Sequence, residues 1–233
     1  MTPLTQLSPA IQSLYPANIR NTYEIHEWRN ASVILNVVHP NEWADLITVL
    51  GTFQLKHSSI ITGGGNKSRV AAAFDSHLYA LGWVKMTFNT NVTVNQTSYP
   101  VPTHEGDCFK NEIAVEVEWN NKDPFYDRDL NNFRLLFDLR TVDVGIIITR
   151  TDDLQSIFES IGRGSSYGAS TTHMSKLLPK IDGGGAGGCP VIVFGISPAL
   201  YVVDTDPVSI AELDEAARLA QAEAIIAEAE EEE

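Results

Sequence analysis

The chain is poor in cysteine and in long apolar runs, and each shortage argues against a class of protein. Cys108 and Cys189 are the only cysteines among 233 residues, which disfavours a disulfide-rich secreted fold and favours a reduced, cytoplasmic protein. No run of 18 apolar residues exists, so no membrane-spanning helix is predicted. Residues 1–16 have neither a basic start nor a long apolar run and do not resemble a secretory signal.

Basic residues are also scarce, with 16 bases against 30 acids and a net charge of −14. Residues 205–233 hold ten of the acids and one base, so most of the excess lies in an Ala/Glu-rich tail. Residues 1–204 are long enough for one domain with a sizeable core. The net charge argues against nucleic acid as a partner without excluding it, because affinity depends on the local patch that faces the phosphates.

Hydrophobic periodicity predicts alternating helices and strands after a helical or mixed N-terminal third. The predicted helices are residues 41–50, 67–81, 127–139, 152–162 and 172–181, and the predicted strands are 113–119, 144–149 and 190–196, with 87–97 as an edge strand or ribbon. Residues 211–230 are compatible with a further helix. The alternation between residues 113 and 196 predicts crossover connections and a partly parallel central sheet, which is an α/β fold.

One segment concentrates acidic side chains in a pattern that suits chemistry. In a strand over 113–119, the apolar residues face one side while Glu116 and Glu118 face the other. Two such carboxylates repel each other and lose solvation, and a hard divalent cation offsets both costs. A turn at Lys110–Asn111 would bring Asp107 beside Glu116. Three acids around a metal ion suit phosphodiester hydrolysis. The alternative is that the two glutamates form the solvated face of an edge strand.

The same acids carry a resemblance to a known family. Asp107, then Glu116-Val-Glu118 in a strand, a helix, and Val144-Gly-Ile-Ile-Ile-Thr-Arg150 resemble the BglII-type type II restriction endonucleases, which have the PD-(D/E)xK nuclease fold. The runs at 171–179 and 183–195 are also similar to prokaryotic relatives of that group. The resemblance covers about residues 60–200, so we expect a restriction-endonuclease-like core with a mixed central sheet flanked by helices. We therefore expect residues 1–204 to form a single nuclease domain with this core inside it, followed by the acidic tail 205–233.

The resemblance also implies roles for individual residues. Asp107 and Glu116 match the family's metal ligands, and the backbone carbonyl of Val117 would be a further ligand. Glu118 stands where the general pattern has lysine, which leaves open whether it takes a proton from the attacking water or orients that water. Asp75 is a candidate extra acid from the preceding helix. The implied cofactor is one or two Mg²⁺ ions per site, for which Mn²⁺ would substitute.

The implied activity is in-line attack of water on duplex DNA at a palindromic site, leaving 5′-phosphate and 3′-hydroxyl ends. A palindrome is read by two copies, so a homodimer is expected. No membrane and no nucleotide cofactor are expected, since Asn66 replaces the glycine that a phosphate loop needs before Lys67-Ser68. Two alternatives stay open. One is a structure-specific repair or junction nuclease, and the other is a catalytically silent DNA- or protein-binding domain.

Two polar segments and one arginine are candidate DNA contacts, because short donors and bases suit phosphates and base edges. They comprise Lys67, Ser68 and Arg69 after the glycine-rich turn 63–65, then Arg163, Ser170, Thr171, Thr172, His173 and Lys176 in and after a loop, and Arg134 on a helix. The alternatives are a plain helix cap, a mobile surface loop and a surface arginine. Structural zinc is not expected, because no second Cys/His pair accompanies His104 and Cys108.

Overall fold

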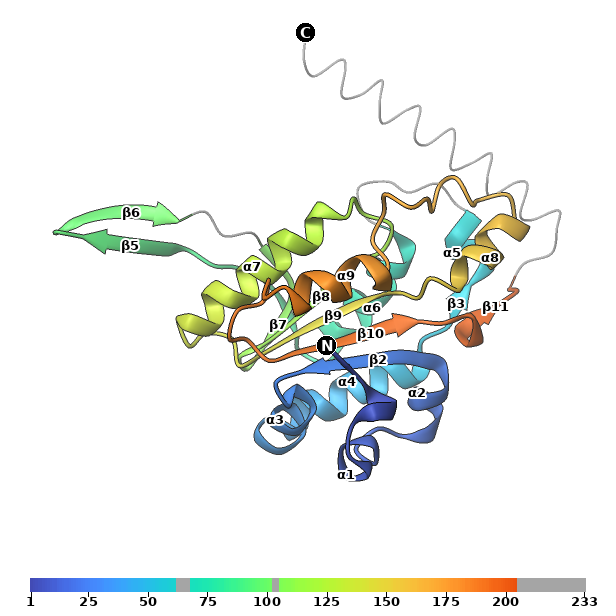
Figure 1. Cartoon of the computed structure of the whole chain (residues 1–233), viewed down its shortest axis with the longest axis horizontal. Coiled ribbons are helices and arrows are strands. Elements are labelled where there is room, and N and C mark those ends of the chain that lie inside the picture. Colours follow the sequence, from blue (N-terminus) through green and yellow to red (C-terminus); the bar gives the residue numbers. More distant parts are fainter. Residues whose placement is uncertain (62–67, 102–104, 205–233) are drawn as a thin grey trace, which may run out of the picture.

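A seven-stranded mixed sheet forms the centre of the computed structural model, which describes residues 1–61, 68–101 and 105–204 (Figure 1). In spatial order its strands are β1 (Thr2–Pro3), β2 (Tyr23–Trp28), β10 (Val191–Ile196), β9 (Val144–Arg150), β8 (Ile113–Val117), β7 (Glu105–Lys110) and β4 (Val84–Thr87). Strands β8, β9 and β10 run parallel, and the other pairs are antiparallel. The partly parallel central sheet predicted from the sequence is therefore confirmed.

Helices lie on both faces of this sheet. One face is covered by α7 (Pro124–Asp138) and α9 (Met174–Asp182), which pack on Ala114, Ile147 and Val193. The other face is covered mainly by the remaining helices, which are α1 (Pro9–Gln12), α2 (Ala17–Thr22), α3 (Ala31–Val38), α4 (Pro40–Thr52), α5 (His57–Ile61), α6 (Arg69–Ala80) and α8 (Leu154–Ser160), with the short 3-10 turns η1 (Leu4–Gln6) and η2 (Pro198–Leu200). No helix in the described ranges is long and apolar enough to cross a bilayer.

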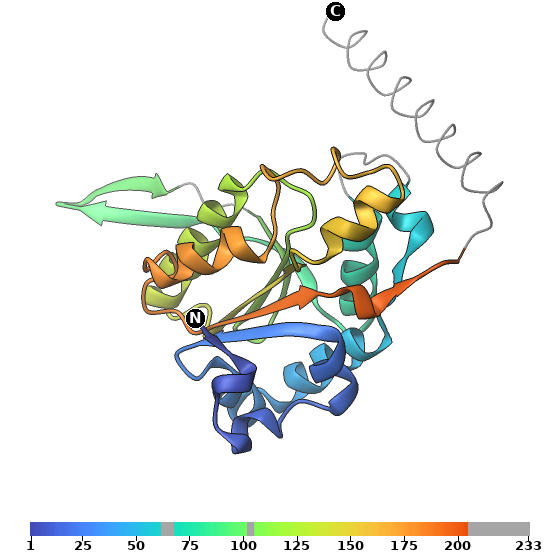
Figure 2. The same cartoon turned by 45° about the vertical axis from the view of Figure 1, so that its right-hand side comes forward.

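Two small sheets stand apart from the main one. Strand β3 (Leu55–Lys56) pairs with β11 (Tyr201–Val202). Strand β5 (Thr90–Val94) pairs with β6 (Thr97–Val101), and Figures 1 and 2 show this ribbon projecting from the body. The segment 87–97, predicted as an edge strand or ribbon, thus ends β4 and forms most of the projecting ribbon.

Strands β9 and β10 are buried along their whole length, as their β-branched sequences predicted. Alternation divides their side chains between the two faces: Ile146 and Ile148 join the core under α6, whereas Ile147 joins the core under α7. Strand β8 lies between β9 and β7. It is therefore not an edge strand, and the alternative interpretation of its glutamates as a solvated edge face is wrong.

The remaining predictions differ from the structure mainly at boundaries. Helix α6 begins where the Ser68 hydroxyl accepts a hydrogen bond from the Ala71 amide at 3.0 Å. The predicted helix 152–162 is too long, because α8 spans only Leu154–Ser160. The sequence did not reveal β2, which pairs along β10 inside the main sheet, because its polar Glu24, His26 and Glu27 interrupt the apolar pattern. The predicted helix 211–230 lies outside the described residues.

The packing of α7 on β9 leaves no space at Gly145. A Cβ atom at this position would lie 2.4 Å from Cδ2 of Phe133. We expect Gly145→Ala to lower the free energy of unfolding by roughly 1–3 kcal/mol, because overpacking forces side chains off their rotamers. Urea denaturation would measure this. The double variant Gly145→Ala/Phe133→Leu should be more stable than the sum of the single variants predicts, and strict additivity would contradict the contact.

Candidate active site

Glu116 and Glu118 lie on the face of β8 that is covered by α7, opposite the core that contains Val115, Val117 and Trp119. They are 3% and 1% exposed. The hydrogen-bond ladder between β8 and β9 continues past Val117, the last residue of β8, since the Glu118 amide donates to the Ile148 carbonyl at 2.9 Å. The alternation of the sequence therefore carries two carboxylates into the interior, as predicted.

Asp107 lies on the neighbouring strand of the β7–β8 hairpin. The register pairs Cys108 with Val115 and Phe109 with Ala114, so its continuation sets Asp107 opposite Glu116. Asp107 is half-buried, and its backbone carbonyl accepts a hydrogen bond from the Tyr79 hydroxyl of α6 at 2.9 Å. The hairpin thus sets the first predicted acid opposite the second, although its turn lies at Asn111–Glu112, because Lys110 still belongs to β7 and pairs with Ile113.

Burial makes the ionised form of these carboxyls unfavourable. It raises the pKa of Glu116 well above its ordinary value, and the charges of Asp129, Asp107 and Glu118 raise it further. Burial and the neighbouring Asp129 also raise the pKa of Glu118, to about 9. The pKa of Asp129 is raised by burial as well. Glu116, Glu118 and Asp129 therefore disfavour one another's ionised form, and a cation that reaches them would relieve this repulsion.

Three polar residues that the sequence analysis missed surround Glu118. Asn121 donates to its Oε2 at 2.6 Å, and the Arg128 guanidinium lies 3.3 Å from its Oε1. Arg128 also pairs with Asp129 at 2.8 Å and lies over the Phe125 ring, 4.5 Å from its centroid. Asp129 occupies the buried stripe of α7 beside Leu130. A carboxylate on an otherwise apolar helix face was the signal that could have found it.

The polar run after α8 is fastened to the same end of β8. Thr172 donates from its hydroxyl to the Glu118 carbonyl at 3.3 Å, and its amide donates to the Asn121 carbonyl at 2.9 Å. Lys122 and Thr171 form an isolated β-bridge. The structure thus brings the predicted DNA-binding loop to the predicted acids, although these segments are about fifty residues apart in sequence.

The side chains of that run divide into two groups. Thr171, Thr172 and His173 are buried, and Thr171 accepts from Arg150 at 3.2 Å. Ser170 is exposed and Lys176 is half-buried, with Lys176 Nζ 3.7 Å from Asp123. The buried group holds the loop in place, whereas Ser170 and part of Lys176 remain accessible to a ligand.

The other predicted DNA contacts are dispersed. Lys67 lies outside the described residues. Ser68 caps α6, and Arg69 is exposed on its first turn. Arg134 is exposed on α7 and donates to Asn131 at 2.7 Å, whereas Arg163 is half-buried and donates to the Ile61 carbonyl.

Asp75 lies on the other face of the sheet from Glu116. Its carboxylate accepts from the Cys108 thiol at 3.6 Å, and Cys108 belongs to the core that contains Val115. The structure therefore places Asp75 behind the strand that carries Asp107 rather than among the acids of β8.

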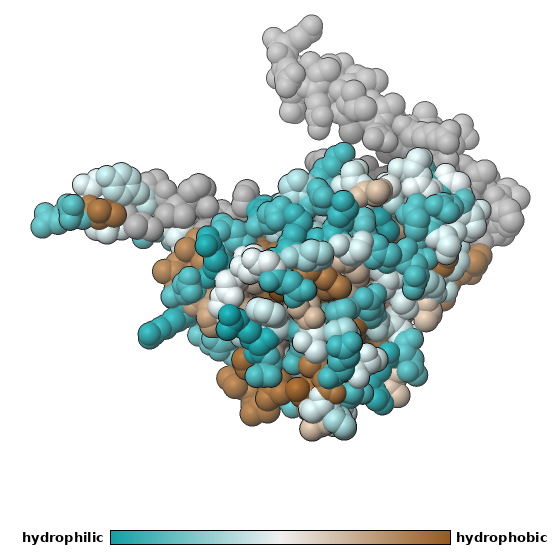
Figure 3. Space-filling view, viewed as in Figure 1, coloured by the Kyte–Doolittle hydropathy of each residue, from teal (hydrophilic) through white to brown (hydrophobic). Residues whose placement is uncertain are grey.

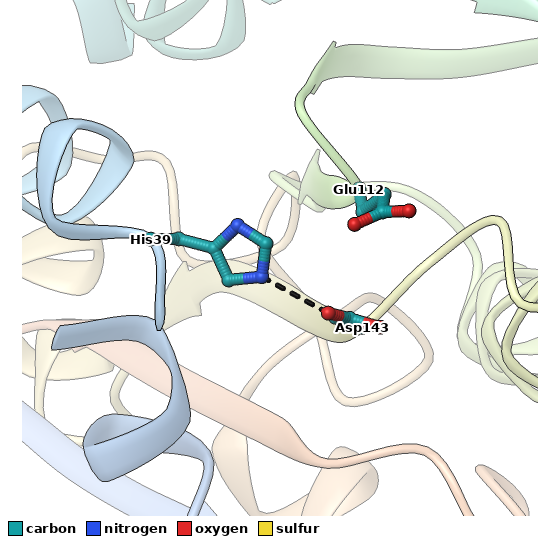
Figure 4. A group of neighbouring side chains, drawn as sticks. All are labelled: His39, Glu112 and Asp143. Atoms are coloured by element: carbon teal, nitrogen blue, oxygen red, sulfur yellow. Dashed lines mark hydrogen bonds and ion pairs between the residues drawn. The ribbon is translucent and has the colours of Figure 1, made fainter. Parts of the chain in front are cut away.

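A second cluster of potential ligands lies at the opposite end of the parallel strands (Figure 4). Ligand atoms of His39, Glu112 and Asp143 lie within 4.8 Å of one another, and His39 Nε2 is 3.0 Å from Asp143. Within residues 1–61, 68–101 and 105–204, no other three His, Cys, Asp or Glu side chains come this close. Asp107, Glu116 and Glu118 are thus spaced more widely. Glu112 and Asp143 precede β8 and β9, whereas Glu116 and Glu118 lie toward the far end of β8.

The potential metal ligands around β8 are of the chemical type that a hard divalent cation binds. They are carboxylate oxygens, which Mg²⁺ prefers, and Oδ2 of Asp129 is buried with no hydrogen-bond partner among the described residues. Arg128 offsets charge at Glu118 and Asp129 but forms no ion pair with Glu116 among the described residues. Asp107 and Glu116 are therefore the two acids of this set that form no ion pair among the described residues, and a bound cation would supply that partner.

Arg128 is expected to stabilise the fold through its two carboxylate partners. Arg128→Ala should lower the free energy of unfolding by about 1–3 kcal/mol at neutral pH, because it leaves buried acceptors without their donor. The matched control is Arg134→Ala on the same helix, which should stay within about 0.5 kcal/mol of the wild type. Equal losses in the two variants, measured by urea denaturation, would contradict the assignment.

The raised pKa of Glu118 predicts a pH dependence of stability. A carboxyl whose pKa rises from 4.5 to about 9 on folding stabilises the fold in its protonated form, and this contribution declines as the pH rises between these values. Glu118→Gln cannot ionise. Without added metal, its free energy of unfolding should fall less than that of the wild type between about pH 5 and about pH 8. Parallel profiles would show that Glu118 ionises equally in both states.

A protein-family model described as restriction endonuclease BglII/BglIII matches residues 23–196, from the start of β2 to the end of β10. The matched range contains Asp107, Glu116 and Glu118 together with the loop that contacts them, and it confirms the resemblance inferred from the motifs. No significant match was found among curated proteins.

Proposed function

Because the chain belongs to the restriction endonuclease BglII/BglIII family, we propose that it is a Mg²⁺-dependent type II enzyme acting on duplex DNA. It hydrolyses phosphodiesters at a palindromic site and leaves 5′-phosphate and 3′-hydroxyl ends. The observation that supports this most is the buried pair Glu116 and Glu118 on β8, with Asp107 on the adjoining strand. Such burial is costly and has no evident structural purpose.

In this proposal Asp107, Glu116 and the Val117 carbonyl hold the cation, and Mn²⁺ substitutes for Mg²⁺. A bound divalent cation polarises the phosphate and lowers the pKa of the attacking water. Glu118 is held at both oxygens by Asn121 and Arg128. It can therefore orient the water or take its proton without moving. Asp75, which contacts Cys108 on the other face of the sheet, is not part of this set.

The DNA lies at the end of β8 where the loop 163–173 is attached. The exposed Ser170 and Arg69 and the half-buried Lys176 contact phosphates or base edges, and Arg134, Arg163 and Ser68 contribute at the margins. Thr171, Thr172 and His173 act by holding the loop. Two copies read the two halves of the palindrome as a homodimer. The protein works in the cytoplasm without a nucleotide cofactor, and the division into a nuclease domain, 1–204, and a tail, 205–233, is part of the proposal.

One observation favours a second candidate function. Arg128 already supplies a positive charge to Glu118 and Asp129, and the three predicted acids are not within 4.8 Å of one another. A catalytically silent DNA-binding domain would retain such a self-compensated cluster. Nicking of a supercoiled plasmid with and without Mg²⁺ separates the two. Digestion of a long defined DNA into discrete fragments then separates a site-specific enzyme from a structure-specific nuclease.

Glu116→Gln is expected to abolish cleavage while sparing DNA binding. The rate of plasmid cleavage should fall by roughly 10²–10³-fold or more, because a preorganised electrostatic group is lost. The control is Glu105→Gln on β7, an exposed acid that pairs with Lys85 and should leave the rate within about twofold of the wild type. Cleavage by Glu116→Gln at the wild-type rate would remove this residue from the site.

A further inference from the structure

Arg150, the last residue of β9, is a buried positive charge without a negative partner. It is 2% exposed, and no carboxylate forms an ion pair with it in the part of the chain that the structure describes. Both of its hydrogen bonds come from Nη2, which donates to the Tyr167 carbonyl at 2.9 Å and to the Thr171 hydroxyl at 3.2 Å. Nε is buried with no hydrogen-bond partner among the same residues. Burial of an unpaired charge is costly, so this arginine indicates a site for an anion.

Two aromatic rings lie beside the guanidinium. Its carbon is 5.3 Å from the centroid of Phe158 and 6.0 Å from that of Tyr167, and the two rings stack with their centroids 4.0 Å apart. The rings attract a cation but carry no net charge. Burial lowers the pKa of the Arg150 guanidinium, yet an arginine stays protonated at neutral pH. The positive charge therefore persists in surroundings that screen it weakly.

Arg150 lines a pocket of about 350 Å³, a volume typical of sites for small ligands. The other described residues that line it are Asp152, Gln155, Tyr167, Gly168, Ala169 and His173. Asp152 is the only acid among them, and its carboxylate accepts hydrogen bonds from the Ser175 amide and hydroxyl at 3.1 and 2.6 Å. This carboxylate is also exposed to solvent. It is therefore engaged by α9 and leaves the charge of Arg150 uncompensated.

The surface around the pocket is suited to a polar ligand. In Figure 3 the residues over α8 and the loop 163–173 are mainly hydrophilic or neutral, whereas apolar surface gathers at α3. The polar lining and the buried cation both favour a small anion over an apolar molecule.

The pocket lies at the end of the sheet that carries the candidate active site. Strands β8 and β9 run parallel, and Glu118 and Arg150 stand at their carboxyl ends. Arg150 packs on the α8 side of the sheet, whereas Glu118 lies on the α7 side. Thr171 accepts a hydrogen bond from Arg150, and the next residue, Thr172, donates to the Glu118 carbonyl at 3.3 Å. One loop therefore joins the pocket to the acids.

We propose that the pocket at Arg150 binds a phosphate group, and the loop that it shares with Glu118 favours a phosphate of the DNA backbone. A guanidinium suits phosphate because its N–H groups pair with two oxygens at once. Since Arg150 and Glu118 lie on opposite sides of the sheet, this phosphate is a neighbour of the one that is cleaved. The inference rests on the proposed function and adds a substrate contact to it.

A phosphate site of this kind also accounts for DNA binding by an acidic protein. The chain has a net charge of −14, which repels a polyanion at long range. Affinity depends on the charge at the contact itself, and an uncompensated arginine in a weakly screened pocket interacts with phosphate more strongly than an exposed one does.

The first test is the affinity for a fluorescently labelled DNA duplex without Mg²⁺, measured by anisotropy. Gln155→Glu places a carboxylate in the pocket beside Arg150 and should raise the dissociation constant roughly tenfold or more, because it occupies the charge that the phosphate needs. The matched control is Ser156→Glu, which adds the same charge to an exposed position of the same helix. It should stay within about twofold of the wild type, since exposed charges are screened by salt. Urea denaturation would confirm that both variants are folded.

The second test uses inorganic phosphate without DNA and separates a free anion from a DNA phosphate. Phosphate should raise the Tm of the wild type more than chloride of equal ionic strength does, because it binds the folded state. The general stabilising effect of phosphate acts on every variant alike, so Gln155→Glu should lose only the part that depends on the site. Ser156→Glu should respond as the wild type does.

The two measurements together decide the assignment. Weaker duplex binding by Gln155→Glu supports a DNA phosphate, whereas a lost phosphate response with unchanged duplex binding assigns the pocket to free phosphate. A Gln155→Glu variant that matches the wild type in both measurements would overturn the phosphate site. A wild type that shows both responses but does not cleave DNA with Mg²⁺ would overturn the nuclease and spare the pocket.

Discussion

Burial of the carboxylates of Glu116 and Glu118 is the constraint on which the rest of the structure depends. Strand β8 is hydrogen-bonded to β7 on one side and β9 on the other, and α7 covers the face on which the two side chains lie. Ionising either group there is unfavourable. Arg128 and Asn121 offset part of this cost by binding the Glu118 carboxylate. Burial of the continuous apolar strands β9 and β10 contributes the free energy that stabilises the sheet despite these acids.

The site is assembled from segments that have little in common except their attachment to the end of β8. Helix α7 supplies Arg128 and Asp129, β7 supplies Asp107, and the loop 163–173 is bonded to the Glu118 carbonyl through Thr172. Displacement of any one segment would change the electrostatic environment of the others.

The two ends of the parallel strands have different roles. At one end His39 bonds Asp143 and Asn111 bonds Glu42 at 2.7 Å, which ties the N-terminal helices to the sheet and to the hairpin turn. At the other end Glu118 and Asp129 share one arginine, and Asn121 adds a neutral donor to Glu118 alone. Polar groups that satisfy one another stabilise a fold, whereas coupled groups with raised pKa values are more typical of a functional site.

The sequence by itself determined that β8 alternates, that Glu116 and Glu118 share one face, and that a turn before β8 returns Asp107 toward them, because alternation and turns are local properties of the chain. The position of that turn, Asn111–Glu112, differs by one residue from the predicted one. It also predicted the buried strands β9 and β10. Only the tertiary structure decided that β8 is central rather than an edge, that β2 joins the sheet, that Asp75 lies behind it, and that Arg128 and Asp129 meet Glu118. Those outcomes depend on which distant segments pack together, and no local pattern of side chains encodes that choice.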